Sequence, residues 1–275
     1  MRIDAHQHFW EFDAIRDNWI NDSMQVIQKD FLPNDLKPLL DSHGFEGCIA
    51  VQSNASEAEN AFQLKNASLH DFIKGVVGWI DPRAKNLRER LAYYSTYNKM
   101  KGFRYGLQGE EQRNLMLDPV FMKGIGLLKN FGFTYDILIY ADQLKYIPEF
   151  TTAFPEQKFV LDHIGKPDIK HHKINDWKKD IAEVAKCPNV YCKISGMITE
   201  AAWQQWKQAD FIPYLDVVTE VFGINRIMYG SDWPMCELAG GYQPMLGVVE
   251  DYFSSYSENE QELFFGGNAN AFYGL

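Results

Sequence analysis

The sequence predicts an α/β fold, a single (β/α)8 barrel of the TIM type. Strand-like apolar runs recur eight times along the 275 residues, and a helix-like stretch follows each run. Such alternation produces a parallel sheet, and eight units in about 250 residues favour a closed barrel. An open doubly wound sheet usually carries a glycine-rich phosphate turn, which this sequence lacks. Without a linker, low-complexity tract or short repeat, residues 1–275 are expected to form one domain.

The predicted strands are short, and many are apolar on both faces, as parallel strands covered on both sides should be. They span Arg2–Ala5, Gly47–Gln52, Lys74–Ile80, Lys101–Arg104, Thr134–Tyr140, Lys158–Asp162, Val190–Ile194 and Arg226–Gly230.

Helix boundaries are marked by capping residues. Gly44 ends the first helix, Ser56 and Glu59 have the spacing of a capping box, and Asp118 with Pro119 opens the fourth helix. The predicted helices span Pro33–His43, Ser56–Phe72, Leu87–Tyr97, Pro119–Asn130, Gln143–Ala153, Asn175–Lys186, Phe211–Phe222, Tyr242–Tyr256 and Glu258–Phe265.

Composition narrows the classes of function. Hydrophobic residues make up 46% and aromatics 15%, which is enough for a large core and an aromatic-lined pocket. The formal net charge is −10 and no basic cluster stands out, so we expect binding neither to nucleic acid nor to an anionic membrane. No signal peptide precedes the first strand, and a cytoplasmic location is expected.

The four cysteines are expected to be reduced, because none forms a Cys-x-x-Cys pair. Cys48 and Cys192 lie inside strand-like runs, where a thiol acts as a small apolar group. Cys236 follows the last predicted strand and could be exposed there, but no base adjoins it, which disfavours a nucleophilic role.

Polar side chains stand where the predicted strands end. In β/α barrels, chemistry collects at these carboxyl ends, which share one mouth. The ends carry His6, His8, Gln52, Trp79, Asp81, Arg104, Tyr135, Asp136, Tyr140, Asp162, His163, Lys193, Ser195, Ser231, Asp232, Trp233 and Pro234.

His6 and His8 are two residues apart at the end of the first strand, so their side chains should point to the same side. A pair at this spacing can hold a metal or donate to a bound carbonyl. The alternative is one packed and one solvated histidine. His163 and Asp232, at the ends of strands six and eight, favour a functional site, because strands one and eight are neighbours in a closed barrel.

With these residues in place, the chain resembles the amidohydrolase superfamily, and within it the lactonase-type branch that includes fuconolactonases and rhamnonolactonases. The matching segments occur in the right order over nearly the whole chain. They are Asp4–Trp10, Lys101–Arg104, Val160–Pro167, Val190–Gly196, Tyr229–Pro234 and Gly267–Leu275. The resemblance implies a distorted (β/α)8 barrel and an enzyme that hydrolyses a cyclic ester.

The chain departs from the wider superfamily at its metal ligands. Arg104 stands where similar binuclear enzymes place a carboxylated lysine, and no histidine ends strand five. A single zinc ion would rest on His6, His8 and Asp232, with His163 or water completing the shell. We expect catalysis without a required metal, with one divalent ion as the alternative.

The mechanistic hypothesis makes Asp232 the general base that activates water. His6, His8 and His163 would stabilise the oxyanion, and His163 could return a proton to the leaving alkoxide. Arg104 and Lys193 are the expected contacts for hydroxyl or carboxylate groups. Further candidate substrate contacts are Gln52, Tyr135 and Asp136 for hydroxyls, and Trp10, Trp79 and Trp233 for stacking on a ring.

The leading substrate is a sugar-acid 1,4- or 1,5-lactone, with a carboxylated lactone still open. One alternative function is a metal-dependent decarboxylase, or another hydrolase of the superfamily, acting on a carboxylated cyclic substrate. The other is an inactive barrel that binds a small ligand. The sequence leaves a homo-oligomer open.

Overall fold

The computed structural model describes residues 1–275 and contains one eight-stranded parallel sheet in the order β1 to β8. Its strands are β1 (Ile3–Gln7), β2 (Gly47–Val51), β3 (Ile73–Gly78), β4 (Met100–Gly106), β5 (Thr134–Leu138), β6 (Phe159–Leu161), β7 (Val190–Ile194) and β8 (Ile227–Tyr229). Each strand pairs in parallel with the next along the chain. The predicted barrel is therefore confirmed.

The barrel closes between β1 and the segment that follows β8. The His8 N–H donates to the Trp233 carbonyl at 2.7 Å, and the Asp232 N–H donates to the His6 carbonyl at 2.8 Å. Gln7 and Trp233 form an isolated parallel bridge at the same point. The seam of the barrel thus joins the two segments that carry His8 and Asp232.

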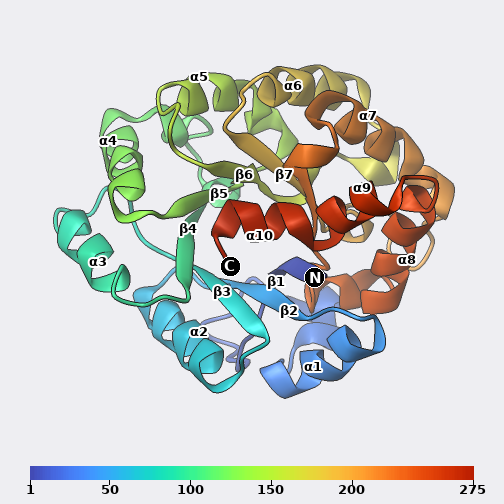
Figure 1. Cartoon of the computed structure of the whole chain (residues 1–275), viewed down its shortest axis with the longest axis horizontal. Coiled ribbons are helices and arrows are strands. Elements are labelled where there is room, and N and C mark those ends of the chain that lie inside the picture. The colour runs from blue at the N-terminus through green and yellow to red at the C-terminus, as the bar shows by residue number, and fades with distance from the viewer.

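A ring of helices surrounds the sheet (Figure 1). The helices are α1 (Pro33–Ser42), α2 (Glu57–Leu69), α3 (Leu87–Tyr94), α4 (Pro119–Leu128), α5 (Ile147–Thr152), α6 (Asn175–Ala185), α7 (Ile212–Phe222), α8 (Tyr242–Phe253), α9 (Glu258–Glu262) and α10 (Asn268–Tyr273). None is long and apolar enough to cross a membrane.

The capping signals are mostly confirmed. The Asp118 carboxylate accepts from the N–H groups of Val120 and Phe121 at the start of α4. The predicted capping box of α2 is only half formed, because Ser56 accepts from the Glu59 N–H while the Glu59 carboxylate accepts from Ser53 and Gln63. The N–H and hydroxyl of Ser53 and the amide of Gln63 therefore take the place of the Ser56 N–H that a capping box would use.

Two predicted helices divide. The stretch expected at Gln143–Ala153 is a 3₁₀ segment, Ala141–Tyr146, followed by α5. The final helix ends at Glu262, and a π-type turn, Leu263–Gly267, leads into α10. At Gly266 any β-carbon would lie 2.1 Å from the Met1 carbonyl, so the chain needs glycine where it passes under β1.

All four cysteines are buried and unpaired. The prediction that Cys236 could be exposed is wrong, because Cys236 is a buried residue of the 3₁₀ turn Met235–Ala239. Burial raises the pKa of the Cys236 thiol well above its ordinary value, which leaves it protonated and unreactive.

Candidate active site

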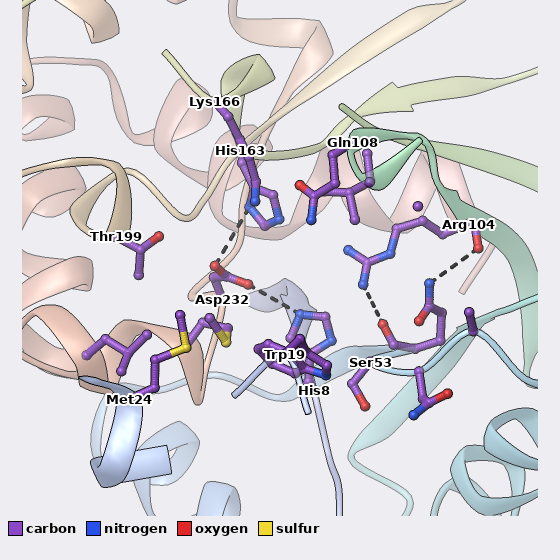
Figure 2. Close-up of a pocket in the computed structure, with 18 of the residues that line it drawn as sticks. His8, Trp19, Met24, Ser53, Arg104, Gln108, His163, Lys166, Thr199 and Asp232 are labelled. Atoms are coloured by element: carbon purple, nitrogen blue, oxygen red, sulfur yellow. Dashed lines mark hydrogen bonds and ion pairs between the residues drawn. The ribbon is translucent and has the colours of Figure 1, made fainter. Parts of the chain in front are cut away.

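Asp232 lies among three imidazoles at the mouth of the barrel. Its Oδ1 is 3.3 Å from His8 Nε2 and 3.7 Å from His6 Nε2, and its Oδ2 is 3.9 Å from His163 Nδ1. Figure 2 shows the carboxylate between His8 and His163. All four residues are at least 95% buried. The structure therefore assembles the four residues that the sequence named as catalytic.

His6 and His8 lie at an irregular part of β1. The pairing of β1 with β2 shifts register between Asp4 and Gln7. Asp4 accepts from the N–H groups of His6 and Ser231, which holds this irregular segment against the end of β8. Alternation then places His6 and His8 on one side, as predicted.

Strained backbone carries three of the side chains at the site. His163, Ile164 and Lys166 have φ of 54°, 48° and 49°, with Gly165 at 73° between them, so residues 163–166 form a left-handed turn. Asp232 has φ of 57°. Non-glycine residues rarely adopt this region, and such strain is typical of functional sites. The turn brings His163 and Lys166 into the cavity, one above the other in Figure 2.

Charges at the site favour an ionised base. Burial alone would raise the pKa of Asp232, but His163 and His8 hold it well below its ordinary value. Burial lowers the pKa of His163 to about 4, against the opposing effect of Asp232. At neutral pH, Asp232 is therefore a carboxylate and His163 a neutral imidazole, and Ser195 Oγ lies 3.0 Å from His163 Nδ1.

His6 belongs to a buried ion network beneath the cavity. Its Nδ1 lies 3.2 Å from Asp162 Oδ1 and 3.2 Å from Lys193 Nζ, while its Nε2 lies 3.2 Å from Arg104 NH1. Lys193 Nζ also contacts Asp136 Oδ2 at 2.5 Å. Two cations and two carboxylates balance around the ring, as buried charges require.

This network surrounds both ring nitrogens of His6. Burial lowers the pKa of His6 well below its ordinary value. Nδ1 faces a donor, Lys193 Nζ, as well as an acceptor, Asp162 Oδ1, while Nε2 faces the Arg104 guanidinium. The predicted role of His6 in stabilising the oxyanion stays a prediction, because the ring is fully buried and lies outside the cavity lining.

His8 has an equally well-defined orientation. Its Nδ1 lies 2.8 Å from the Val51 carbonyl, which can only accept, so Nδ1 carries hydrogen. The Nε2 atom then faces the Asp232 carboxylate at 3.3 Å. A nitrogen lone pair and a carboxylate oxygen that face each other in this way form a contact that a cation could bridge.

The residues present fit one divalent ion. His6, His8 and Asp232 each offer a buried ligand atom, and the three atoms lie within 4.8 Å of one another. Two imidazole nitrogens and one carboxylate are an ordinary zinc donor set. Arg104 lies beside the same His6 nitrogen, so an ion there would have a guanidinium as its neighbour.

A cavity of about 570 Å³ opens above these residues. His8, His163 and Asp232 line it, whereas His6 lies beneath it and is fully buried. Among the predicted substrate contacts, Arg104, Gln52 and Trp10 line the cavity. Arg104 is fixed there by donating to the Gln52 carbonyl and to Asp162.

Five predicted substrate contacts lie outside the cavity lining, which is a correction to that set. Lys193 and Asp136 are fully buried and pair with each other below the site. Tyr135 precedes Asp136 on β5 and so points to the opposite face, where it packs on aromatic rings of α4 and α5. Trp79 stacks on Tyr105, and Trp233 is buried edge-on against Phe9 and Phe31.

The cavity also contains charged residues that the sequence reasoning missed as site residues. Lys166 Nζ lies 3.7 Å from Glu200 Oε1, and both line the cavity. Trp203 and Arg16 also line the cavity. Lys166 stands inside the family-like segment Val160–Pro167, which is a signal that could have identified it.

The family model described as Amidohydrolase matches residues 3–275, nearly the whole length. The chain belongs to the amidohydrolase family. L-fucono-1,5-lactonase of Burkholderia multivorans is 37% identical over 100% of this chain and 96% of its own length. L-fucono-1,5-lactonase of Burkholderia ambifaria is 33% identical over 99% of this chain and 95% of its own length.

A solved structure shows the same architecture. The crystal structure of an amidohydrolase from Burkholderia multivorans with bound zinc superposes on this amidohydrolase with a TM-score of 0.94. The two chains are 37% identical, and the match covers 100% of this chain and 99% of the other.

Proposed function

We propose that this amidohydrolase hydrolyses the ring ester of a sugar-acid lactone, with L-fucono-1,5-lactone as the first substrate to test. One observation carries the proposal: the Asp232 carboxyl group lies between His8 and His163, and all three side chains line a cavity of about 570 Å³. The two Burkholderia lactonases match over the whole chain and support the same substrate class.

In the proposed reaction, Asp232 takes a proton from water as the water attacks the lactone carbonyl. The oxyanion is stabilised by donors that face the cavity, namely the Arg104 guanidinium and, when protonated, His8. Asp232 Oδ2 lies 3.9 Å from His163 Nδ1, so the proton is held next to the group that can return it to the leaving alkoxide.

We propose further that hydrolysis does not require a metal. A divalent ion held by His6, His8 and Asp232 would polarise the carbonyl and the attacking water. Arg104 already brings positive charge to the same place, and no histidine ends β5 to complete a shell.

Lys166 and Glu200 are proposed substrate contacts. An ammonium donates and a carboxylate accepts, so the pair can bind two neighbouring hydroxyls of a sugar ring. Trp203 and Trp10 also line the cavity and offer apolar surface to the sugar ring.

The test compares two reactions and one binding measurement on the purified chain. Proton release from L-fucono-1,5-lactone and other sugar lactones is the expected result. Carbon dioxide release from a carboxylated aromatic acid would support the decarboxylase alternative instead. Calorimetric binding of a sugar lactone without turnover would indicate an inactive binding barrel.

A further inference from the structure

Each arginine that lines the cavity has a carboxylate partner within the protein. Arg16 Nε and NH2 donate to the two carboxylate oxygens of Asp17, at 2.9 and 2.7 Å. Arg104 NH1 donates to Asp162 Oδ2 at 3.1 Å. Asp17 and Asp162 are buried, so water and salt screen these pairs only weakly. Both guanidinium groups are therefore neutralised before a substrate enters.

Lys166 is the one lysine that lines the cavity, and it too has a partner. Its Nζ lies 3.7 Å from Glu200 Oε1 and 5.4 Å from the centre of the Tyr140 ring. Burial raises the pKa of the Glu200 carboxyl group, against the opposing effect of Lys166. A cation this close favours the ionised form of the carboxyl group. The ammonium of Lys166 thus faces the cavity with its charge already balanced.

The charges in and beneath the cavity are negative overall. Four cations stand against five carboxylates: Arg16, Arg104, Lys166 and Lys193 against Asp17, Asp136, Asp162, Glu200 and Asp232. A substrate carboxylate loses hydration in such a cavity and finds no unpaired cation, which is unfavourable. The hydroxyls of a neutral sugar lactone can donate and accept at the same pairs without that penalty.

We propose that Glu200 determines substrate specificity: by neutralising Lys166, it restricts hydrolysis to lactones that carry no carboxylate. The inference rests on the proposed lactone hydrolysis and narrows its substrate class. Glu200 is the partner that can be changed with least effect on the fold, because its side chain is 24% exposed whereas Asp17 and Asp162 are buried. Without the Glu200 charge, Lys166 offers a free ammonium to a substrate carboxylate, and a repelling charge is removed as well.

The test is Glu200→Gln, which keeps the shape of the side chain and removes its charge. The probes are D-galactono-1,4-lactone and D-galactaro-1,4-lactone, which differ by a carboxylate in place of the terminal hydroxymethyl group. Two readouts are needed: kcat and KM for both lactones, and calorimetric affinities for the two corresponding lactams, which resist hydrolysis. The matched control is Glu111→Gln, which removes the same charge from an exposed residue outside the cavity lining.

The wild type should favour the neutral lactone by about a hundredfold in kcat/KM, and Glu200→Gln should narrow this preference about tenfold through a lower KM for the anionic lactone. The lactam affinities should change in the same direction. Glu111→Gln should keep the wild-type preference. Adding Lys166→Met to Glu200→Gln should abolish the gain, because the freed ammonium is then absent.

An unchanged preference in Glu200→Gln, or a gain that survives the loss of Lys166, would overturn the inference. A wild type that treats the neutral and anionic compounds equally would do the same. If the wild type hydrolysed no sugar lactone, the proposed function would fail, while the lactam affinities would still decide the role of Glu200. Failure to bind either lactam as well would overturn both.

Discussion

Gly196 stands against the ring of His163 so closely that a β-carbon would lie 2.6 Å from His163 Nδ1 and 3.1 Å from Asp232 Oδ2. Its φ of +62° also disfavours a side chain. Gly196→Ala should therefore displace both catalytic groups and lower kcat/KM by about a hundredfold. The control is Gly132→Ala, where φ is +75° but nothing lies within 4 Å of a β-carbon. That variant should lose stability and keep its turnover, and an equal loss of turnover would contradict the explanation.

Asp232→Asn tests the base. Asparagine has the same shape and tolerates the left-handed backbone at φ of 57°, so the fold should persist. Because an amide cannot take the proton, kcat should fall by about 10³-fold. Asp168→Asn is the control, since Asp168 pairs with His171 and Lys173 away from the cavity lining. Near-normal turnover in Asp232→Asn would remove Asp232 from the mechanism.

Lys166→Met and Glu200→Gln test substrate recognition. Each should raise KM for a sugar lactone by about tenfold, since a hydrogen-bonding partner of the substrate is lost. Lys173→Met removes a lysine with a side chain that is 72% exposed on the same connection, and it should leave KM unchanged. A lactone without hydroxyls should not distinguish Lys166→Met from the wild type. If it does, Lys166 acts on the reacting ester and not on the hydroxyls.

Metal removal tests whether an ion is required. Dialysis against a chelator, followed by elemental analysis, should leave kcat/KM within about twofold, because Arg104 supplies charge at the same nitrogen of His6. Loss of activity that zinc alone restores would show that His6, His8 and Asp232 hold a required ion.

The pH dependence of stability tests the buried network. Burial raises the pKa of Asp136 from 3.8 to about 6, against the opposing effect of Lys193. Between these values the folded chain binds the proton that the unfolded chain releases, so this contribution to the free energy of unfolding falls as pH rises. Denaturation of wild type and Asp136→Asn should show their difference in stability decreasing from pH 4 to pH 6 and then levelling. An increase over that range would contradict the assignment.

The fold was readable because strand and helix periodicity survive in every unit, and because eight units leave few alternatives. Residues at the seam were also readable, since His6, His8 and Asp232 follow strands that must be neighbours in a closed barrel. Tyr135 shows the limit of this reasoning. It lies next to Asp136 on one strand, so only one of them can point inward, and the sequence does not say which.

The sequence also did not indicate how deep in the barrel an inward-pointing side chain lies. Lys193 does point inward, but it lies below the site, where Asp136 and Asp162 neutralise it. Glu200 ends a three-residue 3₁₀ turn, Ile198–Glu200, which is too short to show periodicity. The left-handed turn at His163–Lys166 uses residues that rarely adopt such a backbone. The local sequence therefore carries no conformational signal for this part of the site.

Catalytic activity depends on closure of the barrel at the seam between β1 and the segment after β8. His8 and Asp232 lie on the two segments that meet there, so a chain whose last strand has detached lacks a base beside His8. Turnover therefore depends on the pairing of β1 with the segment after β8, and a ligand that binds both residues would stabilise that pairing. Slower amide exchange at His8 and Asp232 in the presence of a bound lactone would show this stabilisation directly.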